Sequence, residues 1–269
     1  MKKIFFCGLY FPVLIVFAQV NQTLSNKACK QGEKMEYELN YGLTAGKGSV
    51  ELSPDLYKIK GKTCYKTTIL GESTGILRSL IVKVNDSWLS YSDTSNLLPF
   101  KFQREIIEGD YKKSEISTFD RINKKVSVWS LRKGKEVTKN YNITTNIHDL
   151  VSMYLYMRNL DFSKDKLGTC RYVQFFFEDE IFTMKVQFLG REKIKTDFGK
   201  FNTIKLAPVM PNNKVFEGKD AVVLWLTDDK NKMLLKAKVK VKIIPGTKAT
   251  LKLTSYKGIR HPLTSKVLD

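Results

Sequence analysis

Residue types suited to nucleophilic catalysis meet at His148, Asp149 and Ser152. A serine activated by a histidine, itself oriented by an acid, would carry out acyl transfer. The surrounding pattern is helical, however, and adjacent residues on a helix point about 100° apart. A triad serine also needs a strained turn with amide donors around it, which the middle of a helix does not offer. We therefore expect a capping Asp149, a His148 near the surface, and no enzyme activity.

Two acidic groups suggest other chemistry. Glu36 and Glu38 share one face of an expected strand, about 7 Å apart, which approaches the spacing of a glycosidase pair. Asp228, Asp229 and Asn231 offer oxygen ligands at short spacing, as calcium loops do, but without the glycine and distal glutamate of such loops. A plain hairpin turn explains the second group. A carboxylate-based hydrolase is a minor alternative, and we predict no cofactor or metal.

The N-terminal residues have the pattern of an export signal. Lys2 and Lys3 precede an apolar run over residues 4–17, and Ala18 supplies a small side chain at the cleavage position. An uncleaved anchor is disfavoured because about 14 residues are short of the roughly 20 that span a bilayer. Cys7 lies within the apolar run, not after it, so lipidation is not predicted. We expect an exported protein of the periplasm or outer envelope, not transmembrane after cleavage.

Three cysteines remain after cleavage, at Cys29, Cys64 and Cys170. An odd number permits at most one intramolecular disulfide, and the spacing does not decide which two would pair. Without a C-x-x-C motif or a nearby histidine, a zinc site is not predicted.

The chain of 269 residues has a formal charge of +19, with 42% hydrophobic residues that suffice for a core. Such a charge attracts anionic partners: lipid headgroups, lipopolysaccharide or acidic glycan. Export argues against nucleic acid. Much of the excess follows from alternate lysines on one expected solvent-facing strand, at Lys232, Lys236, Lys238, Lys240 and Lys242.

Short alternating segments separated by turn residues indicate an antiparallel β-meander. The expected strands include residues 36–41, 49–52, two strands within 57–69 around Gly61-Lys62, and residues 76–91, 97–106, 111–119, 126–131, 170–177, 181–189, 201–207, 220–227, 233–244 and 247–256. One segment, residues 146–160, has helical periodicity, with Asn146 placed to cap its first turn. We predict a mainly β protein, a half-barrel or open barrel with one central α-helix. Its parts are a signal peptide (1–18), a flexible segment (19–31), one β-rich domain (32–257) and a tail (258–269).

Several short motifs occur in a specific order along the chain. They are Gly32-Glu33-x-x-x-Tyr37-x-x-x-Tyr41-Gly42-x-x-x-Gly46-x-Gly48, then Asp149-Leu150-x-Ser152-x-Tyr154-x-x-x-Arg158, then Gly199-x-Phe201-x-Thr203-x-Lys205 and Val223-Leu224-Trp225-Leu226-Thr227-Asp228-Asp229. Together they resemble the exported bacterial family called domain of unknown function 3108, over roughly residues 31–256. The resemblance implies an antiparallel half-barrel or open barrel, similar to envelope proteins that handle lipids or capsule, and no known enzyme activity. Family members commonly have a proline after the aspartate pair, where this chain has Asn231-Lys232-Met233.

The leading hypothesis is a non-enzymatic envelope protein that binds a lipidic or glycan component on a concave sheet face. The many aromatic residues of the expected strands would pack a solid core or line an apolar cavity; core is the default. An alternative is an assembly partner in an envelope complex, joined through an open sheet edge. Candidate residues for a structural or binding motif are Asp149, Ser152, Tyr154, Arg158, Tyr37, Tyr41 and Trp225.

Overall fold

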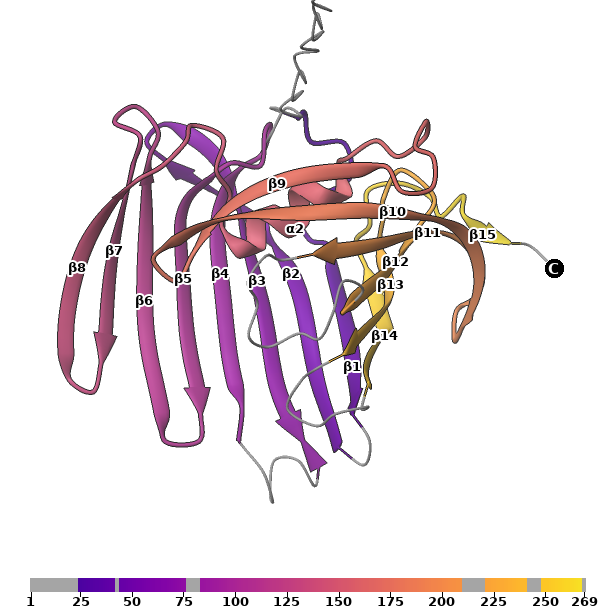
Figure 1. The fold of residues 1–269 in the computed structure, drawn as a ribbon, viewed down its shortest axis with the longest axis horizontal. Helices are drawn as coiled ribbons and strands as arrows, with labels where there is room; N and C mark the ends of the chain where they lie inside the picture. The colour runs from indigo at the N-terminus through magenta and orange to yellow at the C-terminus, as the bar shows by residue number, and fades with distance from the viewer. Residues whose placement is uncertain (1–23, 42–43, 76–82, 210–220, 241–247, 268–269) are drawn as a thin grey trace, which may run out of the picture.

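The computed structural model describes residues 24–41, 44–75, 83–209, 221–240 and 248–267 (Figure 1). Its strands are β1 (Lys34–Tyr41), β2 (Thr44–Ile59), β3 (Lys62–Thr74), β4 (Asn85–Asp93), β5 (Pro99–Glu108), β6 (Tyr111–Asp120), β7 (Lys125–Arg132), β8 (Lys135–Asn142), β9 (Cys170–Phe177), β10 (Glu180–Thr196), β11 (Gly199–Val209), β12 (Val222–Thr227), β13 (Leu234–Lys240), β14 (Lys248–Lys257) and β15 (Lys266–Val267). The helix α2 spans Leu150–Arg158.

The described strands form one antiparallel sheet in the order β8-β7-β6-β5-β4-β3-β2-β1-β14-β13-β12-β11-β10-β9, with β15 beside β11. Two meanders, β1 to β8 and β9 to β14, are therefore joined where β1 pairs with β14. The sheet does not close, because β8 and β9 are its two edges. This arrangement confirms the predicted open antiparallel meander with a central helix.

The sheet curves so that β9 and β10 cross over β2 to β5, with α2 between the two layers (Figure 1). The helix contributes to three hydrophobic clusters of this concave side. Met153, Tyr156 and Met157 pack with β9 to β12, Val151 packs with β5 to β7, and Leu155 packs with β2 and β3. A helix buried on all sides must be apolar around most of its circumference, which explains the sequence of this segment.

Strand alternation assigns the two faces of the sheet. On β5 the side chains of Phe102, Arg104 and Ile106 point to the concave side and are buried, and on β7 Val126 and Val128 do the same. The intervening side chains face outward. The convex face therefore carries most of the charged residues, and the concave face carries the core.

The helix is shorter than the sequence predicts. It begins at Leu150, not near 146, because the backbone of His148 is paired with β9: His148 N–H donates to Gln174 O at 3.2 Å, and Phe176 N–H donates to His148 O at 2.8 Å. Asp149, and not Asn146, is the N-cap. A strand-like contact to a distant segment has thus taken over the turn that the local pattern assigned to the helix.

Both ends of the described chain pack against the domain. Ala28 and Cys29 are 1% and 0% exposed, within the segment 19–31 that the sequence marked as loose. In the tail 258–267, His261 N–H donates to Asn231 Oδ1 at 2.9 Å, and Ser265 Oγ donates to Asp229 Oδ2 at 2.7 Å. Ordered structure therefore extends beyond residues 32–257 on both sides.

Some expectations concern residues outside the described ranges. They are the signal peptide with its cleavage after Ala18, the turn at Gly42, the first part of the strand expected over 76–91 and the end of the one expected over 233–244. The three cysteines that remain after Ala18, Cys29, Cys64 and Cys170, are all free thiols. Within the described ranges, no helix combines the length and the apolar character that crossing a bilayer requires.

Gly258 marks a close crossing of the two chain ends and yields a test. It has a φ of +67°, and a Cβ there would lie 2.1 Å from Gly32 O. Gly134 has a similar φ of +73° with nothing within 4 Å of a Cβ. We expect Gly134→Ala to lower the unfolding free energy by about 1 kcal/mol, the penalty for a left-handed conformation. Gly258→Ala should lower it by about 3 kcal/mol or more, because a steric overlap is added. Urea unfolding measures both, and equal losses would show that the crossing is not as tight as described.

Candidate functional site

The N-terminus of α2 is held by a buried hydrogen-bond cluster. Asp149 Oδ1 accepts from Ser152 N–H at 2.7 Å, and Ser152 Oγ accepts from Asp149 N–H at 3.0 Å, which completes a capping box. Asp149 Oδ2 accepts from Ser90 Oγ of β4 at 2.6 Å. One carboxylate thus caps the helix and ties it to the sheet.

His148 adjoins this cluster and is buried, with 1% of its surface exposed. The expectation of a histidine near the surface is therefore wrong, because backbone pairing with β9 turns the ring inward against Tyr156, whose ring centroid is 4.5 Å away. His148 Nδ1 lies 3.3 Å from Ser152 Oγ. That hydroxyl is already committed to the capping box, so it is poorly placed to act as a nucleophile.

Burial shifts the pKa values of both ionisable groups in this cluster. It raises the pKa of Asp149 to about 6, although hydrogen bonds from Ser152 and Ser90 act in the opposite direction. Burial and the nearby Arg121 guanidinium lower the pKa of His148 to about 3. His148 is therefore neutral at physiological pH, as its apolar surroundings require.

The other end of α2 carries a buried ion pair. Arg158 Nη1 lies 2.5 Å from Glu33 Oε1, and the two side chains are 1% and 0% exposed. Arg158 Nε also donates to Asn231 O at 3.0 Å. Glu33 Oε2 and Arg158 Nη2 are buried without a hydrogen-bond partner. The pair joins the start of β1, the end of α2 and the turn between β12 and β13.

Two tyrosines lie next to this ion pair. The Tyr154 ring is 5.8 Å from Arg158 Cζ, and its hydroxyl lies 3.8 Å from Met35 Sδ. The Tyr37 hydroxyl lies 3.3 Å from the same sulfur and donates to Leu234 O at 3.2 Å. Three of the predicted residues, Tyr37, Tyr154 and Arg158, therefore gather around one buried centre.

The remaining predicted residues lie elsewhere. Trp225 is on β12, on the convex face, where its indole N–H donates to Glu192. Tyr41 ends β1, but its side chain is outside the described part of the chain. Glu33, Ser90 and Asn231 also take part in these clusters, although none of them is a predicted site residue. Glu33 stands within the first quoted motif, whereas nothing in the sequence distinguishes Ser90.

A second buried charge cluster lies on the concave face. Arg104 donates to both oxygens of Glu115, Nε to Oε1 at 3.0 Å and Nη2 to Oε2 at 3.1 Å, and its Nη1 donates to Glu178 Oε1 at 3.1 Å. The Phe177 ring covers the guanidinium at 4.7 Å. Since Phe177 and Glu178 form the β9–β10 turn, these contacts dock that turn on β5 and β6.

Trp88 lies directly opposite Arg104 across β4 and β5. Its ring lies over Gly71, where a Cβ would be 3.5 Å from the indole. Only partly exposed, Trp88 packs against the cluster beside α2. Its Nε1 is buried and has no hydrogen-bond partner. An indole with an unpaired donor and an arginine therefore occupy directly paired positions on the concave face.

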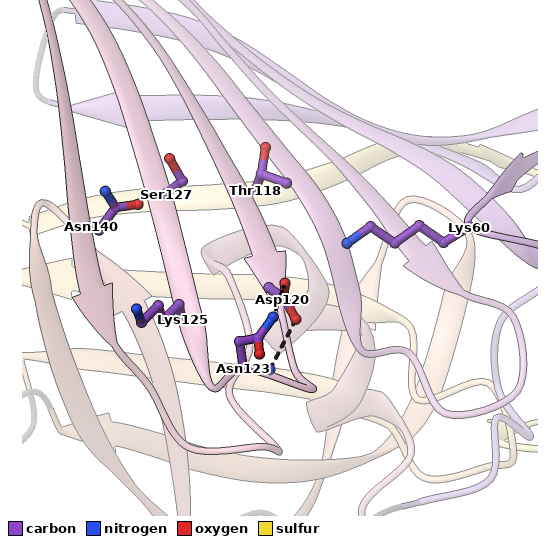
Figure 2. Close-up of a pocket in the computed structure, with 7 residues that line it drawn as sticks. All are labelled: Lys60, Thr118, Asp120, Asn123, Lys125, Ser127 and Asn140. Carbon is purple, nitrogen blue, oxygen red and sulfur yellow. Dashed lines mark hydrogen bonds between the residues drawn. The ribbon is translucent and has the colours of Figure 1, made fainter.

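A hollow of about 500 Å³ lies on the convex face of β6 to β8 (Figure 2). It is lined by Lys60, Thr118, Asp120, Asn123, Lys125, Ser127 and Asn140. Asp120 is occupied by hydrogen bonds from Asn123, as the dashed lines show. The lining combines solvated polar groups with no paired acid and base, so it does not suggest a reaction.

The acidic groups of the sequence analysis make structural contacts. Glu36 is paired with Lys34 at 2.7 Å, and this contact lowers the pKa of Glu36. Asp228 accepts from Arg191 at 2.8 Å. Asp229 accepts from Thr227 and Ser265. Among the described residues, no three His, Cys, Asp or Glu side chains are grouped to hold a metal.

The two shifted pKa values have opposite effects on stability. At pH values between 3.8, the ordinary pKa of an aspartate, and about 6, the folded protein binds a proton at Asp149 that the unfolded chain does not. The contribution of Asp149 to the free energy of unfolding therefore falls as the pH rises. At pH values between about 3 and 6.5, folding releases a proton from His148. The contribution of His148 to the free energy of unfolding therefore falls as the pH drops. Asp149→Asn should therefore make the unfolding free energy more acid-sensitive than wild type, by about 1.4 kcal/mol per pH unit over the shared window. His148→Gln should shift the slope in the opposite direction. Urea unfolding of the wild type and the two variants at a series of pH values measures how the unfolding free energy depends on pH. Identical slopes for the three proteins would show that Asp149 and His148 do not have these shifted pKa values.

The Glu33–Arg158 pair predicts a non-additive double variant. Glu33→Leu or Arg158→Met alone leaves a buried charge without its partner and should lower the unfolding free energy by about 3–5 kcal/mol. The double variant should lose much less than the sum, because no uncompensated charge remains. Losses that simply add would show that the two groups are not coupled. Urea unfolding of all four proteins measures the coupling.

Comparison with known proteins gives one family assignment. A family model described as a protein of unknown function, DUF3108, matches residues 35–254. No curated protein matches the sequence significantly. A crystal structure at 2.70 Å of a candidate lipoprotein from Parabacteroides distasonis superimposes with a TM-score of 0.36 at 10% identity, covering 88% of this chain and 100% of that chain. Superposition at this level supports no inference about function. Because the family match covers most of the sequence, the chain belongs to the DUF3108 family.

Proposed function

We propose that this protein is an exported, non-enzymatic protein of the bacterial envelope that binds a lipidic or glycan component on the concave face of its sheet. The binding site is the surface formed by Trp88, Arg104 and the bare backbone at Gly71. The observation that carries the proposal is the Trp88 indole N–H, which is buried and unpaired at the position directly opposite Arg104 in the sheet. Leaving a buried donor unpaired costs free energy, and a ligand oxygen would remove that cost.

The chemistry of this surface suits an amphiphilic or sugar-like ligand. An indole offers a large flat apolar face together with one polar edge. Arg104 is fixed by Glu115 and Glu178, so its orientation is set before a ligand arrives. Gly71 contributes no side chain, and the neighbouring Ile69 is partly buried and apolar. Such a mixture of apolar surface and few fixed polar groups is typical of small-molecule sites.

Export is supported by the N-terminal pattern and by where packed structure begins. Cleavage after Ala18 would leave a short segment before Leu24, which packs against the core cluster of β9 to β12. The proposed cleavage would therefore leave Leu24 and every other described residue in the mature chain.

One observation favours the alternative of an assembly partner. The edge strand β8 has exposed side chains along almost its whole length, and its outer side is unpaired among the described strands. An unpaired edge can accept a strand from another protein. Crosslinking the native envelope and identifying proteins joined at β8 would support this role, whereas their absence would count against it.

The proposed function is tested with protein purified from the cell envelope. Mass spectrometry should find a chain beginning at Gln19 with a bound lipid or glycan that solvent extraction releases. Trp88→Phe keeps an aromatic ring in the core but removes the N–H, and it should reduce ligand occupancy about tenfold because the buried hydrogen bond is lost. Trp129→Ala is the matched control, since Trp129 lies on the convex face and bonds to Glu136. An intact Met1, or equal occupancy in all variants, would refute the proposal.

A further inference from the structure

A row of directly opposed residues crosses the convex face of seven strands. From β3 through β2, β1, β14, β13 and β12 to β11, its members are Glu72, Lys47, Glu38, Lys252, Lys236, Trp225 and Lys205. They lie outward because their neighbours along the strands, such as Tyr37 and Ala237, are buried in the core. Adjacent members of such a row are about 5 Å apart, so their charges interact.

The two halves of this row differ in charge balance. In the first half Glu72, Lys47 and Glu38 alternate in sign, so each charge faces an opposite one. In the second half Lys252, which has Glu38 on one side, faces Lys236 on the other, and Lys236 has no acid directly opposite it. Like charges opposite one another destabilise a sheet. The contrast lies within a single row, so an even distribution of lysine for solubility does not account for it.

Trp225 is the centre of the unbalanced half. The ammonium groups of Lys205, Lys236 and Lys238 lie 5.2, 5.4 and 5.8 Å from its ring centroid. Their side chains cover the indole, which is only 6% exposed. Glu192 is the carboxylate that contacts this group, through Lys205 at 3.5 Å and the indole N–H. Lys205, Lys236 and Lys238 thus share one contacting acid, Glu192, while Lys252 also has Glu38 opposite it on β1.

A hollow of about 290 Å³ opens beside these lysines. The β10–β11 turn forms one wall, with Lys195 and Asp197, and β13 and β14 form the other, with Lys236 and Lys252. Its apolar lining is Ile194, Leu235 and Leu253. The hollow therefore combines three lysines with one acid, Asp197, beside leucines that belong to the buried core cluster of β1, β13 and β14. Its excess of positive charge suits a phosphate headgroup.

We propose that this convex surface, formed by Lys205, Lys236, Lys238 and Lys252 around Trp225 and the adjoining hollow, docks the protein on the phosphate headgroups of an anionic lipid surface. Phosphates between facing lysines replace repulsion with attraction. The rigid sheet holds the ammonium groups in place, so little is lost in ordering them. The burial of Lys236 and the charges of Lys238 and Lys252 lower its pKa, as expected where a counter-ion is needed. This surface is separate from the concave ligand site.

Vesicle binding tests the proposal. Purified protein is sedimented with vesicles of phosphatidylglycerol and phosphatidylcholine, or of phosphatidylcholine alone. Binding should require phosphatidylglycerol and weaken as salt is added. Lys236→Gln/Lys252→Gln should weaken partitioning about thirtyfold, because each lysine near an anionic surface contributes roughly a fivefold factor. Lys112→Gln/Lys135→Gln removes the same charge at exposed positions far along the sheet, and it should change partitioning little.

Three further outcomes separate this proposal from its rivals. Lys236→Gln should weaken vesicle binding but keep or raise the thermal unfolding temperature, because it relieves repulsion between lysines. A lower unfolding temperature together with weaker vesicle binding would mean that the variant damages the fold, and it would count against the proposal. Trp88→Phe should leave vesicle binding unchanged, which distinguishes this surface from the concave site. Binding to a soluble polyuronate but not to vesicles, or equal losses in both lysine pairs, would overturn the proposal.

Discussion

The buried contact between Arg158 and Glu33 is the constraint that holds the two meanders in one fold. Burying a charge is costly unless a partner and hydrogen bonds satisfy it, so each of these residues needs the other in place. Arg158 ends the helix, Glu33 precedes the first strand, and Asn231 in the turn between β12 and β13 accepts from the same guanidinium. Three segments that are far apart in sequence therefore converge at a single point, with Tyr154 and Tyr37 packed beside it.

The helix acts as the central piece around which the sheet bends. At its start Asp149 bonds to Ser90 of β4, and at its end Arg158 bonds to the β1 side of the sheet. Between these two polar anchors its apolar side chains contact the hydrophobic clusters of both layers. Of the residues predicted to form a structural or binding motif, Asp149, Ser152 and Arg158 make contacts that hold the helix against the sheet.

The strand pattern and the resemblance were sufficient to predict the architecture, because alternation at period two reports directly which side of a sheet is buried. They failed where local pattern carried no information. The strand β8 is mostly polar, with Val137 and Tyr141 as its apolar side chains, so its alternation is too weak to predict a strand, although Tyr141 packs against the core. The helix start was misplaced because His148 pairs with β9, a contact between distant segments. The ion-pair partner of Arg158 and the surroundings of Trp88 come from distant parts of the chain, so no spacing along the sequence predicts them.

The pairing of β1 with β14, which is far away in sequence, has a consequence for biogenesis. Most neighbours in the sheet are also neighbours in sequence, so hairpins can form soon after each is synthesised. One side of β1, however, can be completed only when β14 emerges, and until then its backbone is an open edge. A truncated or stalled chain would expose that edge to other chains. Synthesis of β14 is thus the step that protects the backbone edge of β1.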